Sequence, residues 1–213
     1  MKQRLPAFLL IFLFPVLLSA GNKYWTAGSG NWNDPAHWSE SPNGKGGAGI
    51  PSVNDDIFIG TDVSSEDADT VTIDGKANCR NFNYGDGVNA NKIVLRGNGE
   101  ISVHGSLLFT HAFNDLFTGT WNFSDPAAGV RDNSLPTITT NNHVFSGKLV
   151  FISGPGPQRK NIFLANDNLF VNNSIGINSN SELILSDHTE LVANEIILNG
   201  TGSNVTSRPG SKV

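Results

Sequence analysis

The sequence predicts an all-β protein whose strands coil into a right-handed parallel β-helix. Three observations predict it. Short apolar segments are each closed by Gly, Asn, Asp or Ser, which is the pattern of strands and turns. Glycine and asparagine are both abundant, while charged residues make up only 15% of the chain. The apolar segments also recur at a spacing typical of stacked coils.

The predicted strands are short, and each either alternates apolar and polar side chains or is apolar throughout. They cover residues 56–59, 70–74, 93–95, 101–103, 107–109, 149–152, 169–171, 174–177, 183–185 and 196–198. One segment, residues 187–198, has the Asp187 and Glu190 spacing of a helix capping box. Asn194 and the Asn199-Gly200 ending favour a strand and turn there instead.

The spacing of the segments indicates a solenoid. Strands that start at Val71, Ile93, Trp121, Leu149, Leu169 and Ile196 follow one another at intervals of roughly 20 to 30 residues. A coil of this length cannot bury its apolar side alone, so it stacks on its neighbours. Asparagine and glycine suit the corners, because both tolerate left-handed turn conformations.

An antiparallel β-sandwich is the alternative fold, since it also contains short strands at regular intervals. That fold needs hairpins, and the sequence offers few two-residue hairpin signals. The clearest is Gly97-Asn98-Gly99, which lies between two predicted strands.

The segment 1–20 predicts a signal peptide. Lys2 and Arg4 precede an apolar run of about 14 residues that ends in Ser19-Ala20-Gly21. That run is shorter than a membrane-spanning helix, which needs roughly 20 residues. We therefore expect a secreted or cell-surface protein with no membrane span once the signal is removed.

The net charge and the cysteine content limit the possible partners and cross-links of the chain. The whole chain has a formal net charge of −5, and removal of Lys2 and Arg4 with the signal peptide makes it more negative by two, which argues against a nucleic-acid partner. Cys79 is the only cysteine, so no internal disulfide can form. We expect its side chain to be a small buried apolar group.

Residues 21–60 predict an amino-terminal cap and the first strand, and residues 61–213 predict the coils. Three of the four tryptophans, Trp25, Trp32 and Trp38, lie close together in the cap. Aromatic side chains this dense either fill a core or stack on a ligand such as a sugar ring. In the cap hypothesis, side chains of this segment cover the exposed end of the first coil. The cap residues are Trp32, Asp34, Pro35, Trp38, Pro51 and Asp55. The sugar-stacking hypothesis assigns a ligand to Trp25, Trp32 and Trp38.

The order Trp32-x-Asp34-Pro35-x-x-Trp38, a glycine-rich gap and Pro51-x-x-x-Asp55-Asp56-Ile57-x-Ile59 resembles the opening of β-helical regions in large secreted surface proteins of Bacteroidetes-type bacteria. It is also similar to the start of the extracellular domain named for its eight glycines. The match is strongest over residues 24–75. The resemblance implies a cell-surface or secreted β-helix, often part of an adhesin, and it carries over no catalytic residue. The end at Val213 leaves two interpretations open, namely an amino-terminal piece of a longer chain with further domains, or a last coil covered by a partner.

Several carboxylates gather between Asp55 and Asp74, and no lysine or arginine lies between them. Calcium prefers several oxygen ligands, so Asp55 and Asp56 are candidate ligands of a structural calcium ion. One of this pair is expected to bond backbone amides at the turn into the first strand. The histidines at positions 37, 104, 111, 143 and 188 have no paired spacing for zinc. No other cofactor is expected.

The sequence offers no nucleophile motif, so we expect a non-catalytic, adhesin-like structural and binding module whose partner is a glycan or a host or cell-surface protein. A carbohydrate-binding module that uses the three tryptophans is the first alternative. A β-helical polysaccharide lyase or glycosidase is the second, and it needs two carboxylates roughly 5 to 9.5 Å apart or a base beside calcium. Arg159 and Lys160 are candidates for contact with an acidic sugar.

Overall fold

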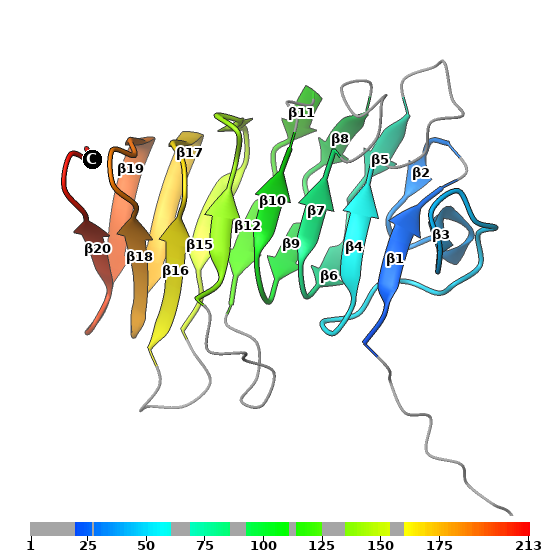
Figure 1. Cartoon of the computed structure of the whole chain (residues 1–213), viewed down its shortest axis with the longest axis horizontal. Helices are drawn as coiled ribbons and strands as arrows, with labels where there is room; N and C mark the ends of the chain where they lie inside the picture. The colour runs from blue at the N-terminus through cyan, green and yellow to red at the C-terminus, as the bar shows by residue number, and fades with distance from the viewer. Residues whose placement is uncertain are drawn as a thin grey trace, which may run out of the picture.

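The computed structural model confirms the parallel β-helix: strands from successive coils stack side by side along one axis (Figure 1). The structure describes residues 20–26, 28–60, 69–85, 93–110, 114–124, 135–153 and 160–213. Residues 1–19 of the predicted signal peptide, residues 62–68 of the acidic stretch, His111 and Arg159 lie outside the described residues.

Sheet A runs the whole length of the stack in the order β20-β18-β16-β13-β10-β7-β4-β1-β3. Its strands are β1 (Asn22–Trp25), β3 (Trp38–Ser39), β4 (Asp56–Ile59), β7 (Phe82–Tyr84), β10 (Leu107–Phe109), β13 (Thr137–Thr139), β16 (Asn161–Ala165), β18 (Ser181–Leu185) and β20 (Asn204–Ser207). All neighbours in this sheet are parallel except β1 and β3, which are antiparallel.

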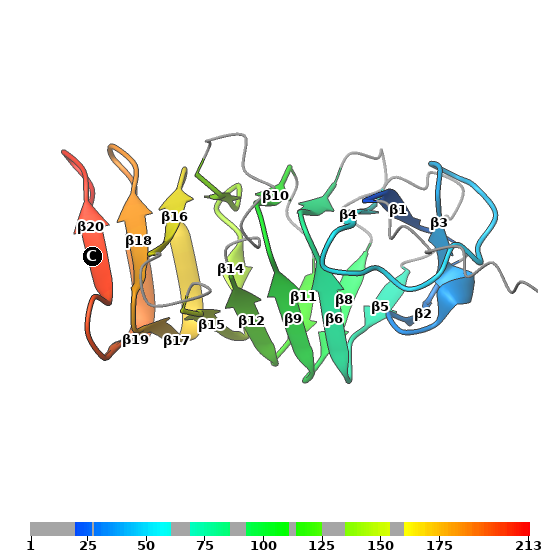
Figure 2. The ribbon, with the colours of Figure 1, turned by 90° about the horizontal axis from the view of Figure 1, so that it is seen from below.

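Two further sheets complete the coils, and Figure 2 shows them on the other side of the stack from sheet A. Sheet B is β11-β8-β5-β2, and sheet C is β14-β17-β15-β12-β9-β6 with β19 added on β17. Their strands are β2 (Gly30–Asn31), β5 (Thr70–Thr72), β8 (Val94–Gly97), β11 (Asn114–Phe117), β6 (Lys76–Cys79), β9 (Glu100–Val103), β12 (Thr120–Phe123), β14 (Val144–Phe145), β15 (Lys148–Phe151), β17 (Leu169–Asn178) and β19 (Leu191–Asn199).

The Gly97-Asn98-Gly99 turn is a coil corner rather than the hairpin that a sandwich would need. It joins β8 of sheet B to β9 of sheet C, and each strand pairs in parallel with strands of neighbouring coils. Gly97 has φ +119°, and a Cβ there would lie 1.9 Å from the carbonyl oxygen of Ile73. Only glycine fits this close approach of two backbones.

The carboxy-terminal coils have two sheets instead of three. The segments at 169–171 and 174–177, predicted as two strands, form the single ten-residue strand β17, with a shift of register between Val171 and Ser174. The strand preferred over the helix at residues 187–198 is confirmed, since β19 occupies Leu191–Asn199. The one short helix is a 3₁₀ turn at Pro35–His37, among the described residues.

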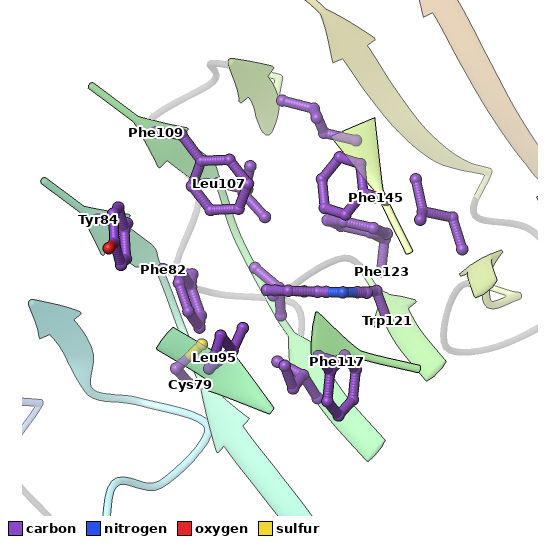
Figure 3. Packing of buried hydrophobic residues seen from close by; sticks show 14 of the residues in the cluster. Cys79, Phe82, Tyr84, Leu95, Leu107, Phe109, Phe117, Trp121, Phe123 and Phe145 are labelled. Carbon is purple, nitrogen blue, oxygen red and sulfur yellow. The ribbon is translucent and has the colours of Figure 1, made fainter. Parts of the chain in front are cut away.

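The core lies along the axis and is built from rows of inward side chains, one per coil. One row of sheet C is Cys79, Val103, Phe123, Phe151, Ile177 and Leu198, and one row of sheet A is Ile57, Phe82, Leu107, Ile138, Ala165 and Leu185. Aromatic rings fill the middle of the stack (Figure 3), where Trp121 lies 5.1 Å from Phe82 and 5.8 Å from Phe117 between ring centroids. Cys79 is a buried member of this core, as predicted.

Candidate binding surface

The three tryptophans of the amino-terminal segment lie inside the protein. Trp32 and Trp38 are fully buried and Trp25 is nearly so, all within the continuous core. The indole nitrogen of Trp38 donates a hydrogen bond of 2.7 Å to the carbonyl oxygen of Trp32. The ring of Trp38 meets Trp25 and Trp32 edge to face, at 5.2 Å and 4.8 Å between centroids. None of these rings presents an open face on which a sugar could stack.

The remaining residues of the predicted cap surround this cluster. Asp34 accepts a hydrogen bond from the backbone nitrogen of Ala36 and begins the 3₁₀ turn, whose first residue is Pro35. His37 follows and stacks on Trp25 at 4.9 Å between ring centroids. Pro51 is buried beside the turn that leads into β4. These contacts cover the outer side of the first coil, where β3 pairs with β1.

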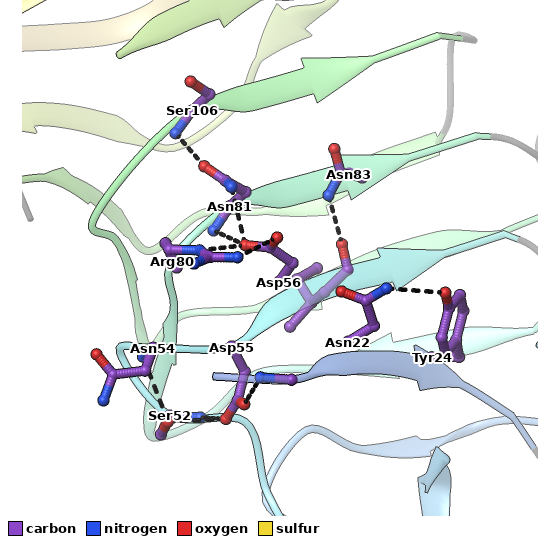
Figure 4. A network of polar contacts seen from close by, with 12 residues as sticks. Asn22, Tyr24, Ser52, Asn54, Asp55, Asp56, Arg80, Asn81, Asn83 and Ser106 are labelled. Atoms are coloured by element: carbon purple, nitrogen blue, oxygen red, sulfur yellow. Dashed lines mark hydrogen bonds and ion pairs between the residues drawn. The ribbon is translucent and has the colours of Figure 1, made fainter. Parts of the chain in front are cut away.

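Asp55 holds the turn into β4 to the start of the described chain (Figure 4). Its Oδ1 accepts a hydrogen bond of 3.0 Å from the backbone nitrogen of Gly21. Its Oδ2 accepts hydrogen bonds from the backbone nitrogen and hydroxyl of Ser52, at 2.8 Å and 2.7 Å. The expectation that one of the two aspartates bonds backbone amides is therefore confirmed for Asp55.

Asp56 forms an ion pair with the next coil. Its carboxylate accepts hydrogen bonds from Nε and Nη2 of Arg80, at 2.7 Å and 2.5 Å, and from the side-chain amide of Asn81 at 2.8 Å (Figure 4). The hydrogen bond to Asp56 raises the pKa of Arg80. The oxygens of both aspartates thus face N–H and O–H donors, whereas a calcium ion would need them as ligands. The described residues contain no group of three His, Cys, Asp or Glu side chains suited to a metal ion, and calcium at Asp55 and Asp56 remains a prediction.

Outward side chains of sheet A form a row that the sequence analysis did not identify. Its members, called the outer row below, are Tyr24, Phe58, Asn83, Leu108 and Thr139, one from each of five consecutive strands. The rings of Tyr24 and Phe58 stack with centroids 4.8 Å apart and planes 17° apart. Leu108 is 37% exposed. Since neighbouring strands lie about 4.8 Å apart, the row is a straight strip about 19 Å long.

The outward face of sheet C has a different chemistry. One of its rows is Asn78, Ser102, Asn122, Val150, Gly176 and Ile197, and another begins Lys76, Glu100, Thr120 and Lys148. Small polar and charged side chains therefore cover the part of sheet C formed by β6, β9 and β12. Sheet C also has an outward apolar row, which consists of Val144, Phe170 and Val192. Sheet A differs in placing two stacked rings, Tyr24 and Phe58, on neighbouring strands, so the outer row is the candidate binding surface.

Lys160, a candidate sugar contact from the sequence, pairs with a carboxylate farther along sheet A. Its ammonium lies 2.8 Å from Oε2 of Glu182. Burial acts to raise the pKa of Glu182, but hydrogen bonds from Lys160, Thr206 and Asn204 outweigh it and leave that pKa lowered. The pair connects the residue before β16 with the neighbouring strand β18, and the lowered pKa favours an ionised Glu182, whereas a general acid must hold a proton.

Ser124 and His104 bring a hydroxyl and an imidazole into direct contact, with 2.7 Å between Oγ of Ser124 and Nδ1 of His104. Burial lowers the pKa of His104, which favours the neutral ring at neutral pH. His104 directly follows β9 and Ser124 directly follows β12, so the two residues lie at the same corner of adjacent coils. A serine beside a neutral histidine is one part of a nucleophilic site, but within the described part of the chain the Nε2 of His104 is buried without the partner that would orient the ring.

The signal for the outer row was present in the sequence as alternation of side chains. In β4 the buried Ile57 and Ile59 flank Phe58, and in β10 the buried Leu107 and Phe109 flank Leu108. Alternation places Phe58 and Leu108 outside. Which outward residues become neighbours depends on the lengths of the intervening loops, and the sequence does not give that register.

Comparisons of the chain with protein-family models, with curated proteins and with solved structures found no match. Within its described part, the chain has no helix of sufficient length and apolar character to cross a membrane.

Proposed function

We propose that this chain is an exported, adhesin-like binding and structural module, secreted or held at a cell surface, in which the outer row contacts a glycan. The signal-like residues 1–20 and the resemblance of residues 24–75 to secreted β-helical surface proteins support export. The module acts without chemistry, by holding a strip of side chains in fixed positions on a rigid stack.

The observation that carries the proposal is the outer row itself. It places two stacked aromatic rings, an amide and an aliphatic side chain on consecutive strands of one sheet. Aromatic rings with adjacent polar groups suit sugar rings, which have both apolar C–H faces and hydroxyl groups. Extended chains fit a straight strip, so a linear glycan matches this geometry better than a small compact ligand.

Rigidity supports the same function. Phe58, Asn83 and Leu108 are each flanked within their strands by two buried core residues, such as Ile57 and Ile59 beside Phe58. Side chains held on packed strands lose little conformational freedom on binding, so less of the interaction free energy is spent on ordering.

The experiment is a glycan array probed with residues 21–213 of the wild type and of two matched leucine variants. Leu108→Ser alters the outer row, and Leu116→Ser alters another exposed leucine on sheet B, where Leu116 is 56% exposed. We expect wild type and Leu116→Ser to bind the same glycans, and Leu108→Ser to bind them several-fold more weakly.

Thermal unfolding of each variant separates a binding effect from a folding effect. Loss of binding by both leucine variants, or by neither, would contradict the outer row as the contact surface. If the wild-type protein binds no glycan on the array but binds a cell-surface protein through the outer row, the glycan part of the proposal is wrong and the partner is a protein.

A further inference from the structure

Asn83 lies in the middle of the outer row, and one half of its side-chain amide is already bonded. Its Nδ2 donates a hydrogen bond of 3.0 Å to the carbonyl oxygen of Ile57 on the neighbouring strand (Figure 4). This bond fixes the orientation of the amide and leaves Oδ1 on its other side. No donor among the described residues reaches that Oδ1, and Asn83 is partly exposed. The group that Asn83 offers to a ligand is therefore a hydrogen-bond acceptor.

Tyr24 and Phe58 complete a short site beside Asn83. The three side chains come from the consecutive strands β1, β4 and β7. The strands of Tyr24 and Asn83 lie about 10 Å apart, with the strand of Phe58 between them. The hydroxyl of Tyr24 accepts a hydrogen bond of 3.3 Å from Nδ2 of Asn22, so its own proton is available to a ligand (Figure 4). The site offers a donor, an apolar ring and an acceptor in that order.

The strands that carry the outer row present no unpaired cation. Lys23 is the one lysine or arginine within β1, β4, β7, β10 and β13. It alternates to the opposite face from Tyr24, and its ammonium donates to the carbonyl oxygen of Ala48. At the corner before β7, Arg80 is bound to the carboxylate of Asp56. The whole chain is negative, with a formal net charge of −5. An anionic ligand would therefore gain no ion pair from these strands.

The cation that follows farther along sheet A does not change this result. Lys160 precedes β16, which lies three strands from β7, at about 14 Å. Its ammonium is paired with Glu182. The nearest sequence candidate for contact with an acidic sugar is therefore both distant from Asn83 and already neutralised.

We propose that Asn83 selects an uncharged glycan, an inference that rests on the outer row being the glycan-contact surface. A sugar hydroxyl both donates and accepts, so one hydroxyl can donate to Oδ1 of Asn83 while another accepts from the hydroxyl of Tyr24. The C–H face between them contacts Phe58. A sulfate or carboxylate group only accepts, so at Asn83 it would meet a second acceptor and leave both unpaired. Asn83 is the specificity-determining residue of the outer row, and it rejects anionic glycans.

An array of neutral linear glucans, mannans and xylans, each printed beside its sulfated form, tests the proposal with residues 21–213. We expect the wild type to bind a neutral glycan about tenfold more tightly than its sulfated form. Asn83→Ala removes the acceptor without adding charge and should weaken binding of the neutral glycan about five- to tenfold. Asn83→Lys replaces the acceptor by a cation and should reverse the preference. Asn122→Lys places the same charge at an outward position of sheet C and should keep the wild-type preference.

Circular dichroism and thermal unfolding establish that each variant is folded, and Asn83→Ala remains sufficient if the lysine variant does not fold. Equal or tighter binding of the sulfated forms by the wild type would overturn the proposal, as would unchanged binding by Asn83→Ala. A reversal caused equally by Asn122→Lys would also overturn it, because net charge alone would then explain the preference.

Leu108→Ser on the same array separates this inference from the proposed function. If Leu108→Ser weakens binding and the Asn83 variants do not, the outer row remains the contact surface and only the role of Asn83 is wrong. If neither Leu108→Ser nor the Asn83 variants change binding, or if the wild type binds no glycan, both proposals are wrong.

Discussion

The carboxylate of Asp55 accepts a hydrogen bond of 3.0 Å from the backbone nitrogen of Gly21, far earlier in the chain. The predicted signal cleavage after Ala20 would make this same nitrogen the α-ammonium group of the mature protein. The hydrogen bond would then become an ion pair, made beside the turn at Ser52. If the predicted cleavage occurs, a new positive charge would form next to the carboxylate that holds the turn into β4.

Replacing Asp55 by asparagine should destabilise the mature protein. The variant side chain keeps one acceptor oxygen but loses the negative charge, and we expect the free energy of unfolding to fall by about 1–3 kcal/mol. Urea denaturation measures the change. Asp74→Asn is the matched control, because Asp74 is exposed and its carboxylate accepts only a side-chain hydrogen bond from Asn31 among the contacts of the described residues. Equal losses for the two variants would refute the special role of Asp55.

Trp38→Phe tests the tryptophan cluster. The variant removes the 2.7 Å hydrogen bond to Trp32 and leaves part of the indole volume empty. We expect a loss of about 2–4 kcal/mol in the free energy of unfolding, since a buried acceptor loses its donor and a cavity forms. A loss below about 0.5 kcal/mol, the range of ordinary surface substitutions, would show that the cluster contributes little to stability.

Stability should decrease as the pH falls below about 6.5, the ordinary pKa of histidine. Burial lowers the pKa of His104 in the folded state. At mildly acidic pH the unfolded chain therefore binds a proton that the folded chain resists, and the linked contribution is lost as the pH falls through the folded-state pKa. His104→Asn should remove this part of the pH dependence in urea titrations.

His188→Asn is the control for that pH series. His188 is exposed and has φ +60°, a conformation that asparagine tolerates. We expect its pH profile to follow that of the wild type. Identical profiles for His104→Asn and the wild type would show that His104 does not contribute.

Cys79 should be unreactive in the native protein. Its thiol is fully buried, and burial raises its pKa well above the usual value, so the reactive thiolate is scarce. We expect no reaction with an aromatic disulfide reagent under native conditions and one equivalent after unfolding. Rapid native reaction would mean that the core around β6 opens readily.

Strands with strong alternation could be predicted from the sequence. The prediction at residues 56–59 matches β4 and that at 107–109 matches β10. β6 was missed because its inward positions hold the small side chains Ala77 and Cys79, which give a weak apolar signal. β17 was divided in two because Asn172 and Asn173 suggested a turn, although they lie at a register shift within one strand.

The candidate site was harder to predict for a physical reason. The ion pair between Asp56 and Arg80 and the stack of Tyr24 on Phe58 each join residues of different coils, far apart in the sequence. The pairings depend on coil lengths, which vary along the chain. The strand starts from which the repeat was predicted also belong to two different sheets, B for Val71 and C for Trp121. The tryptophans were easy to identify as a cluster, but their density predicted either a cap or a sugar site. Only their burial in the structure distinguishes these two arrangements.

The most direct test of the stacked-coil account is a distance series along one outward row of sheet C, with spin labels at Asn78→Cys paired with Val150→Cys or Ile197→Cys. The row runs Asn78, Ser102, Asn122, Val150, Gly176 and Ile197. Buried Cys79 should remain unlabelled. We expect backbone separations of about 14 Å for the first pair and about 24 Å for the second, one strand spacing per coil. A second distance equal to or shorter than the first would contradict the stacking of coils.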